Sequence, residues 1–89
     1  MVHELKIERK YFVDILAGLK TFEVRHDDRN YQPGDFLYMR EYYPDKDKYG
    51  VLEMICCVTY ILRDPAYCKD GFVIMGIRRM DIAKEDIKL

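Results

Sequence analysis

The sequence predicts one α+β domain that is mainly β, a small barrel of about five mostly antiparallel strands with one short helix. Three observations carry this prediction. The 89 residues suffice for one hydrophobic core but not for two. Apolar and polar residues alternate over several short segments, and one segment near the N-terminus changes to a helical period. Short segments rich in turn-forming residues separate these elements, which favours antiparallel pairing.

The first strand is expected at residues 3–8, where apolar residues alternate with charged ones. A helix follows, whose apolar face is formed by residues at spacings i, i+3, i+4 and i+7, namely Phe12, Ile15, Leu16 and Leu19. Gly18 stands where a glycine in the left-handed conformation ends a helix, and Leu19 supplies the usual apolar contact after it. So short a helix needs a sheet to pack against.

Four more strands complete a β-α-β-β-β-β order, at residues 20–25, 35–43, 51–62 and 72–79. Turn-forming residues separate them at 26–35, 44–50 and 63–71. The strand at 51–62 is long for a small domain, so we expect it to be bent or bulged, as in a barrel. The domain is expected to span residues 1–80. Residues 81–89 form a C-terminal tail, which begins with a frayed helical turn at Asp81.

The charges are balanced, with 15 Lys and Arg against 16 Asp and Glu. This balance argues against a protein that coats nucleic acid through bulk positive charge, so a phosphate-binding site would have to use a local patch. We see no secretion signal and no apolar run long enough to span a membrane. The sequence therefore predicts a cytoplasmic protein without a membrane partner.

The cysteines and histidines do not show the spacing of a metal site. Cys56 and Cys57 are adjacent, so on a strand they point to opposite faces, and Cys68 lies in a loop. His3 and His26 add no ligand spacing. We therefore predict reduced thiols and neither a metal nor a redox cofactor.

Ionisable residues of both signs concentrate in residues 18–35. Lys20 directly follows the glycine that ends the helix, so it should point into the opening between helix and barrel. There it would act either as a base or nucleophile, or as an ammonium that meets a phosphate. Glu23 and Arg25 share one face of their strand, roughly 6.5–7 Å apart. An arginine suits a phosphate or a base edge, and a glutamate accepts from an exocyclic amine.

A structural interpretation of the same residues is open. Glu23 and Arg25 would pair with each other, and with Arg40 or Glu41 of the next strand, as an ion-pair network that holds the barrel.

Two further regions offer candidate ligand contacts. Arg29 is a long cation on a loop beside the expected cleft, although its neighbours are ordinary turn formers. Residues 38–50 interleave aromatic and basic side chains, among them Arg40 and Tyr42, a mixture typical of single-stranded nucleic-acid binding. Acidic residues dilute this pattern, and tyrosines at strand ends also serve ordinary packing.

The segment GLKTFEVR at residues 18–25 resembles the GxKxxExR signature of the ASCH superfamily, whose fold is the PUA-like β-barrel. The match consists of Gly18, Lys20, Glu23 and Arg25. The stretches HELKI, DDR, QPGDFL, REY and VTYIL further resemble one branch, small bacterial and phage-borne proteins of the DUF3850 type. The resemblance extends to about residue 78.

This resemblance implies a binding module that recognises RNA or a nucleotide in the cleft between helix and barrel. The expected ligand-binding residues are Lys20, Glu23, Arg25, Arg29, Arg40 and Tyr42. Some ASCH proteins are instead amidohydrolases that act on acylated nucleosides with a Lys, a Thr and a Glu, which would correspond here to Lys20, Thr21 and Glu23. A protein-interaction domain without a small ligand is the third alternative.

Overall fold

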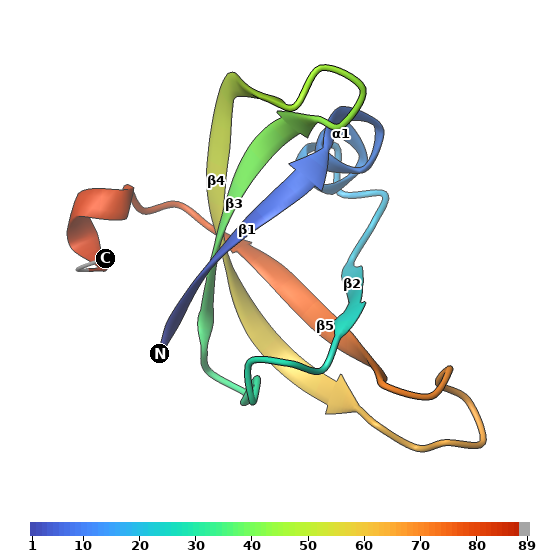
Figure 1. The fold of residues 1–89 in the computed structure, drawn as a ribbon. Helices are drawn as coiled ribbons and strands as arrows, with labels where there is room; N and C mark the ends of the chain where they lie inside the picture. The colour runs from blue at the N-terminus through green and yellow to red at the C-terminus, as the bar shows by residue number, and fades with distance from the viewer. Residues whose placement is uncertain (88–89) are drawn as a thin grey trace.

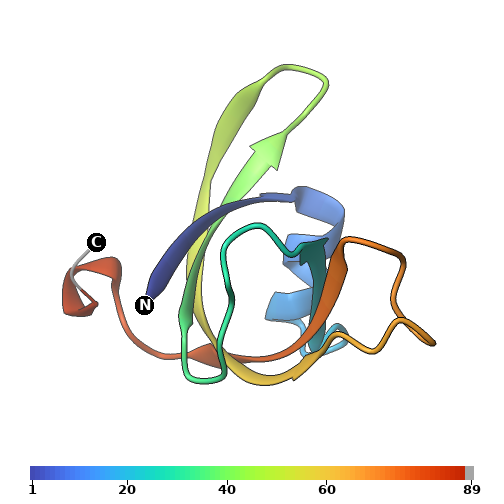
Figure 2. The same ribbon diagram turned by 60° about the horizontal axis from the view of Figure 1, so that its bottom comes forward.

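A computed structural model describes residues 1–87 of the chain. Its elements are β1 (Val2–Glu8), α1 (Arg9–Leu16), β2 (Phe22–His26), β3 (Phe36–Tyr43), β4 (Lys48–Leu62), β5 (Phe72–Met80) and a short 3-10 helix, η1 (Lys84–Asp86). The five strands form one sheet in the order β1-β3-β4-β5-β2. Figures 1 and 2 show this sheet curling into a half-barrel, with α1 beside the carboxyl end of β1. The predicted α+β fold, mainly β, is confirmed.

The two strands next to the helix in sequence, β1 and β2, form the two edges of the sheet. β1 pairs with β3 in parallel, and all other pairs are antiparallel. β2 pairs with β5, from Phe22 opposite Gly76 to His26 opposite Phe72. The expectation that β2 has β3 as its neighbour is therefore wrong. The long turn between β2 and β3 carries the chain past β5 and β4 to a position between β4 and β1.

The hairpin of β3 and β4 extends further than the sequence predicted. β4 begins at Lys48, which pairs with Tyr43, so the strand includes part of the segment that was predicted as a loop, 44–50. Both faces of this end of the hairpin are exposed to solvent. Its two strands can therefore pair through backbone hydrogen bonds without an alternation of apolar and polar residues. The register shifts between Arg40 and Tyr42 and again between Val58 and Tyr60. These irregularities confirm the predicted bulging of the long strand.

The core lies on the concave side of the sheet. It consists of Leu5, Ile7, Phe12, Ile15, Tyr31, Leu37, Met39, Met54, Cys56, Val58, Val73, Met75 and Ile77. The helix contributes only Phe12 and Ile15 to it. Leu16 and Leu19, predicted on the same apolar face, are 38% and 80% exposed. That part of the prediction is wrong because the helix ends at Leu16 and the chain then turns away from the sheet.

Gly18 ends the helix as predicted. Its φ of 77° lies in the left-handed region, which a glycine adopts without a steric penalty. The N–H of Gly18 donates to the carbonyl of Ile15, and the N–H of Leu19 donates to the carbonyl of Asp14, the two bonds of a Schellman motif. Lys20 also donates its backbone N–H to Asp14, at 3.1 Å. This turn fixes Lys20 at the entry to β2.

Asp35 holds the long loop after β2 against β1. Its buried carboxylate accepts a hydrogen bond from the N–H of Gln32 and lies 2.8 Å from Nε2 of His3. The His3 ring contacts Tyr31 edge-on, with ring centroids 4.7 Å apart. Asp35 is thus a turn cap, and His3 has a structural role in the core.

Within residues 1–87, the helices are too short and too polar to cross a membrane. The same part of the chain has no group of three or more metal-binding side chains. Cys56 is buried, Cys57 is half-buried, and both are free thiols. The helical turn expected from Asp81 is the 3-10 helix η1, which begins at Lys84. The tail was predicted to extend over residues 81–89, of which 88 and 89 lie outside the described residues.

Candidate functional site

A cleft of about 480 Å³ opens between β1, α1 and β2. Its polar lining residues are Lys6, Glu8, Lys20, Glu23, Arg25 and His26, and its apolar ones are Ile7, Tyr11, Phe22, Val24 and Phe72. A volume in the range of about 300–1,000 Å³ and a mainly apolar wall with few polar groups are typical of small-molecule sites. The cleft lies where the sequence predicted it, beside the helix and the start of β2.

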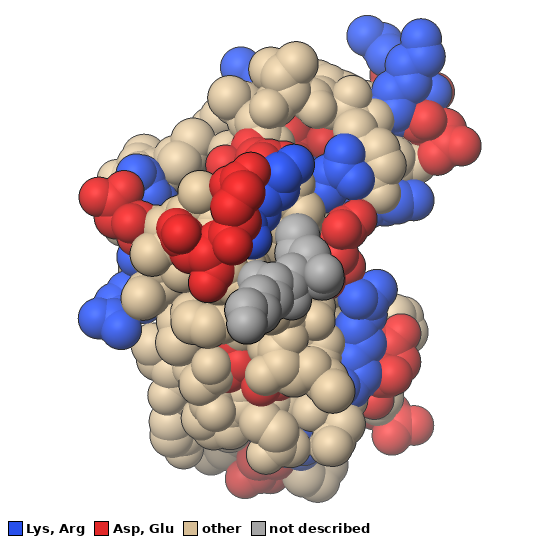
Figure 3. Space-filling model, turned by 90° about the vertical axis from the view of Figure 1, so that its left-hand side faces the viewer, with Lys and Arg blue, Asp and Glu red and all other residues tan. Residues whose placement is uncertain are grey.

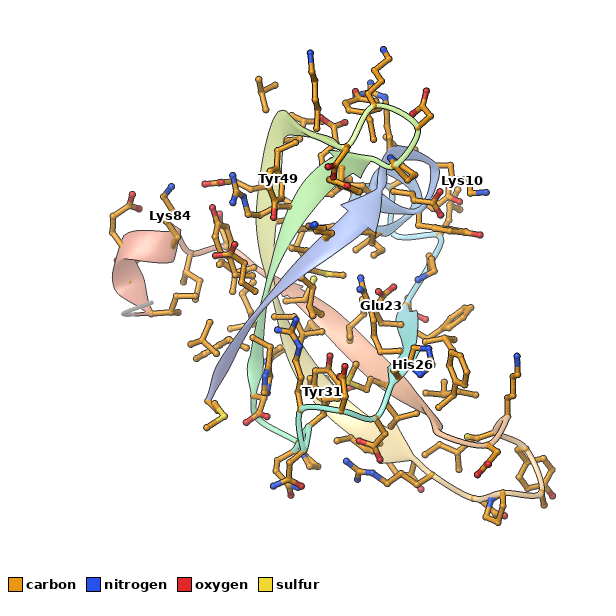
Figure 4. The ribbon with its side chains drawn as sticks, in the orientation of Figure 1. Lys10, Glu23, His26, Tyr31, Tyr49 and Lys84 are labelled. Atoms are coloured by element: carbon orange, nitrogen blue, oxygen red, sulfur yellow. The ribbon has the colours of Figure 1, made fainter. Side chains whose placement is uncertain are left out.

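β2 carries its polar face inward. Glu23 is 5% exposed, whereas its neighbours Phe22 and Val24 are each 46% exposed at the rim of the cleft. Figure 4 shows Glu23 pointing from β2 toward the interior of the half-barrel, while His26 points away from it. The alternation predicted for this strand is correct. Phe22 and Val24 line the rim of the cleft, whereas the buried side of the strand is that of Glu23.

The Glu23 carboxylate is shared by two cations. Its Oε1 lies 2.6 Å from Lys20 Nζ, and its Oε2 lies 2.7 Å from Arg25 Nε. Lys20 also donates to the carbonyl of Phe22 at 2.6 Å, and its ammonium lies 4.9 Å from the centroid of the Phe22 ring. The sequence was right that these three residues gather at one place. Two positive charges against one negative leave the cluster with a net positive charge.

Arg25 also reaches across to the other edge of the sheet. Its NH2 group donates to the carbonyl of Lys6 in β1 at 2.7 Å. Arg29, on the loop after β2, makes a similar bond to the carbonyl of Glu4 at 2.9 Å. Arg29 therefore lies near the cleft but does not line it.

The structural interpretation of the charges is correct only in part. Glu23 does pair with Arg25, but neither Arg40 nor Glu41 joins them. Glu41 is buried and pairs with Arg9 at 2.6 Å, and Arg40 pairs with Glu4 at 3.3 Å. The reason is the strand order, because β3 lies between β1 and β4, and both β4 and β5 separate it from β2.

Arg40 and Tyr42 form a separate group with Tyr49. The guanidinium carbon of Arg40 lies 3.8 Å from the centroid of the Tyr49 ring. Tyr42 contacts the same ring edge-on at 5.5 Å and donates its hydroxyl to Asp47. Neither residue lines the cleft, although Lys6, which does, places its ammonium 4.6 Å from the Tyr42 ring.

Thr21 also lies outside the cleft lining. Its side chain is exposed, and its carbonyl accepts a hydrogen bond from the N–H of Ile77 at 3.0 Å. Of the three residues that would correspond to a hydrolase set, the cleft thus includes Lys20 and Glu23.

Sequence reasoning missed the aromatic walls of the cleft. Tyr11 projects from α1, and Phe72 comes from β5, where its ring lies 4.2 Å from that of His26. Only the pairing of β2 with β5 brings Phe72 to this place. Local periodicity carries no signal for a contact between residues so distant in sequence.

Away from the cleft, the face that carries the C-terminal segment has charges of both signs, and Figure 3 shows acidic and basic side chains interspersed over it. This distribution agrees with the balanced composition of the chain. The positive excess around Glu23 is therefore a local feature.

The fold and the cleft define a class of small β half-barrel proteins with a charged, aromatic-lined site. Residues 2–77 match the family model described as "Domain of unknown function (DUF3850)", and the chain belongs to this family. It is also similar to a curated protein described as "Uncharacterized 12.9 kDa protein in GpA 3'region" of Escherichia phage P2. The two are 46% identical over 41 residues, which is 46% of this chain and 38% of the phage protein. The matched region is thus less than half of that relative's length.

Proposed function

We propose that this protein is an RNA- or nucleotide-binding module of the ASCH superfamily, with a PUA-like fold, that takes its ligand in the cleft beside Glu23. The observation that carries the proposal is a carboxylate buried between two cations in the wall of an aromatic-lined cleft. A buried ion cluster contributes little to stability by itself. A strand that served packing alone would bury Phe22 and Val24 and expose Glu23. A ligand that contacts Glu23 better explains why β2 buries its polar face and exposes its apolar one.

Each lining group has a chemical role in this proposal. Arg25 offers a planar fork and Lys20 a point charge, both suited to a phosphate. Glu23 accepts a hydrogen bond from an exocyclic amine or a ribose hydroxyl. The rings of Tyr11 and Phe22 offer apolar faces on which a base can stack.

The signature at residues 18–25 supports the same assignment, because its four matched positions include all three members of the charged cluster. We further propose that the protein acts in the cytoplasm, where its free cysteines would stay reduced.

The test is a fluorescence-polarisation titration against labelled single-stranded and hairpin RNAs at several salt concentrations. We expect affinity to fall with salt at a shallow slope, about −0.7 in log–log form for each phosphate contacted on a single strand. Lys20→Ala and Arg25→Ala should lose affinity while thermal melts show that they remain folded. Arg78→Ala removes an exposed cation of β5 outside the cleft and is the matched control. If the folded wild-type protein binds neither of these RNAs and no ribonucleoside monophosphate, the proposal is wrong.

A hydrolase acting on acylated nucleosides is the second candidate. The 2.6 Å contact between Lys20 and Glu23 inside the cleft favours it, since both groups would meet a bound substrate. The exposed position of Thr21 argues against it. Release of free acid from an acylated cytidine-like nucleoside, abolished by Lys20→Ala, would establish this activity. If Lys20→Ala changes stability alone, a protein-interaction domain without a small ligand is the better description.

A further inference from the structure

A second hollow, of about 430 Å³, adjoins the cleft. It is lined by Glu4, Leu5, Lys6, Arg25, Arg29 and Tyr49. Lys6 and Arg25 line both hollows, so the hydrogen bond between the Arg25 guanidinium and the Lys6 carbonyl separates one from the other. The two hollows therefore follow each other along β1.

Two arginines bridge the open side of the half-barrel here. β1 is an edge strand, and the carbonyls of Glu4 and Lys6, two residues apart, accept from Arg29 and Arg25 at 2.9 and 2.7 Å. These two guanidinium groups, and not hydrogen bonds between paired strands, thus close the seam between β1 and the part of the chain that includes β2 and the loop after it. A neutral carbonyl is a weaker acceptor for a guanidinium than a phosphate, which carries a negative charge and can accept two parallel hydrogen bonds from an arginine. A phosphate that entered the seam would compete well for both donors.

An aromatic platform stands at the far end of the second hollow. Tyr49 is 43% exposed, and Arg40 covers its ring at 3.8 Å. Lys6 lies 5.8 Å from the same ring. An exposed ring with cations around it is suited to stacking a nucleobase whose backbone lies nearby.

The groove formed by the two hollows has a positive balance on a chain whose net charge is −1. Its cations are Lys6, Lys20, Arg25 and Arg29, and its anions are Glu4, Glu8 and Glu23. Arg40, which pairs with Glu4, adds a further cation at the edge. The field along β1 therefore attracts an anionic strand.

We propose that the two hollows form one groove that holds a single-stranded RNA segment of more than one nucleotide. One base occupies the cleft, the adjoining phosphates contact Arg25 and Arg29, and the next base stacks on Tyr49. β1 spans about 13 Å from Glu4 to Glu8 at roughly 3.3 Å per residue. This is longer than the roughly 3.4 Å rise of one nucleotide in a stacked strand. This inference rests on the proposed function and adds to it that the ligand is longer than one nucleotide.

The experiment compares a labelled RNA pentanucleotide of mixed sequence with the four ribonucleoside monophosphates, which are measured by competition. We expect the pentanucleotide to bind at least about tenfold more tightly, because it reaches a second base platform. Arg29→Ala should weaken pentanucleotide binding and reduce the magnitude of the salt slope by about 0.7. It should leave mononucleotide affinity unchanged.

Two further variants separate charge from stacking. Tyr49→Ala should weaken pentanucleotide binding about fivefold or more with the salt slope unchanged. This variant also provides a readout independent of the loop that carries Arg29. Arg78→Ala, which removes the same charge as Arg29→Ala from outside the groove, should keep the wild-type affinity and slope.

Three results would overturn the inference. Equal affinity for pentanucleotide and mononucleotides, with both lost in Arg25→Ala, would confine the ligand to the cleft and leave the proposed function standing. Absence of binding to the pentanucleotide and to all four mononucleotides would overturn both proposals. Binding of a penta-aspartate peptide as tightly as RNA would assign the groove to an acidic protein segment instead.

Discussion

Lys20 Nζ lies 2.6 Å from Glu23 Oε1 at the entry to β2, and this contact places two residues of the sequence signature inside one cleft. The opposite oxygen of the same carboxylate accepts from Arg25 at 2.7 Å. The short spacing of these residues in the sequence becomes an ion cluster because Gly18 turns the chain into the strand just before Lys20. An edge strand can carry such a cluster inward, since only one of its neighbours is a strand.

Replacement of Glu23 by glutamine should destabilise the protein. Glu23→Gln keeps the shape and one acceptor oxygen, but it leaves Lys20 and Arg25 facing each other without a counter-charge. We expect a loss of about 1–3 kcal/mol in the free energy of unfolding, measured by urea denaturation. Glu8→Gln changes an exposed carboxylate at the same cleft and should stay within about 0.5 kcal/mol. An equal loss of stability in Glu23→Gln and Glu8→Gln would contradict the expectation that the ion cluster around Glu23 depends on its charge.

Gly50 should not tolerate a side chain. A Cβ at this position of β4 would collide with the carboxylate of Glu41, which is 1% exposed and paired with Arg9. We expect Gly50→Ala to cost about 1–3 kcal/mol in unfolding free energy, as for other overpacked sites. Because the collision involves the Glu41 carboxylate, the loss of stability caused by Gly50→Ala should be smaller in a protein that already carries Glu41→Ala. A double-mutant cycle measures this coupling, and additive effects would show that the collision is relieved in another way.

Asp35 should make stability depend on pH. Burial acts to raise the pKa of this carboxyl, but the hydrogen bonds from His3, from the backbone of Gln32 and from the N-terminal ammonium together outweigh it and hold the pKa below its usual value. A lowered folded-state pKa means that the carboxylate stabilises the fold above about pH 4, and that this stabilisation disappears as pH falls through the folded-state pKa. Asp35→Asn should therefore be less stable than wild type at pH 7, and the gap should narrow below about pH 4. Chemical denaturation at several pH values measures this difference in stability. A difference that stays constant from pH 7 to below about pH 4 would contradict the lowered pKa of Asp35.

Cys56 should be unreactive in the folded protein. Burial raises the pKa of its thiol to about 11, so almost no thiolate is present at pH 8. A variant with Cys57→Ser and Cys68→Ser keeps Cys56 as its remaining thiol. We expect slow alkylation by iodoacetamide at pH 8 in buffer and fast alkylation in urea, followed by mass spectrometry. Equally fast modification in both conditions would mean that β4 opens readily at this position.

Much of the local structure was predictable from the sequence. Gly18 ends the helix, the long fourth strand is bulged, and Lys20, Glu23 and Arg25 share one site. These features follow from interactions between residues close in sequence, whose backbone preferences and spacing the sequence displays directly.

The tertiary structure alone decided which face of β2 is buried and what surrounds it. Periodicity tells which residues of a strand share a face, but not which face turns inward when the strand lies at the edge of a sheet beside a cleft. The pairing of β2 with β5 brought Phe72 to the cleft, and the edge position of β1 brought Lys6 to Arg25. Such contacts join segments far apart in the chain, so they depend on how the whole sheet closes and not on any local pattern.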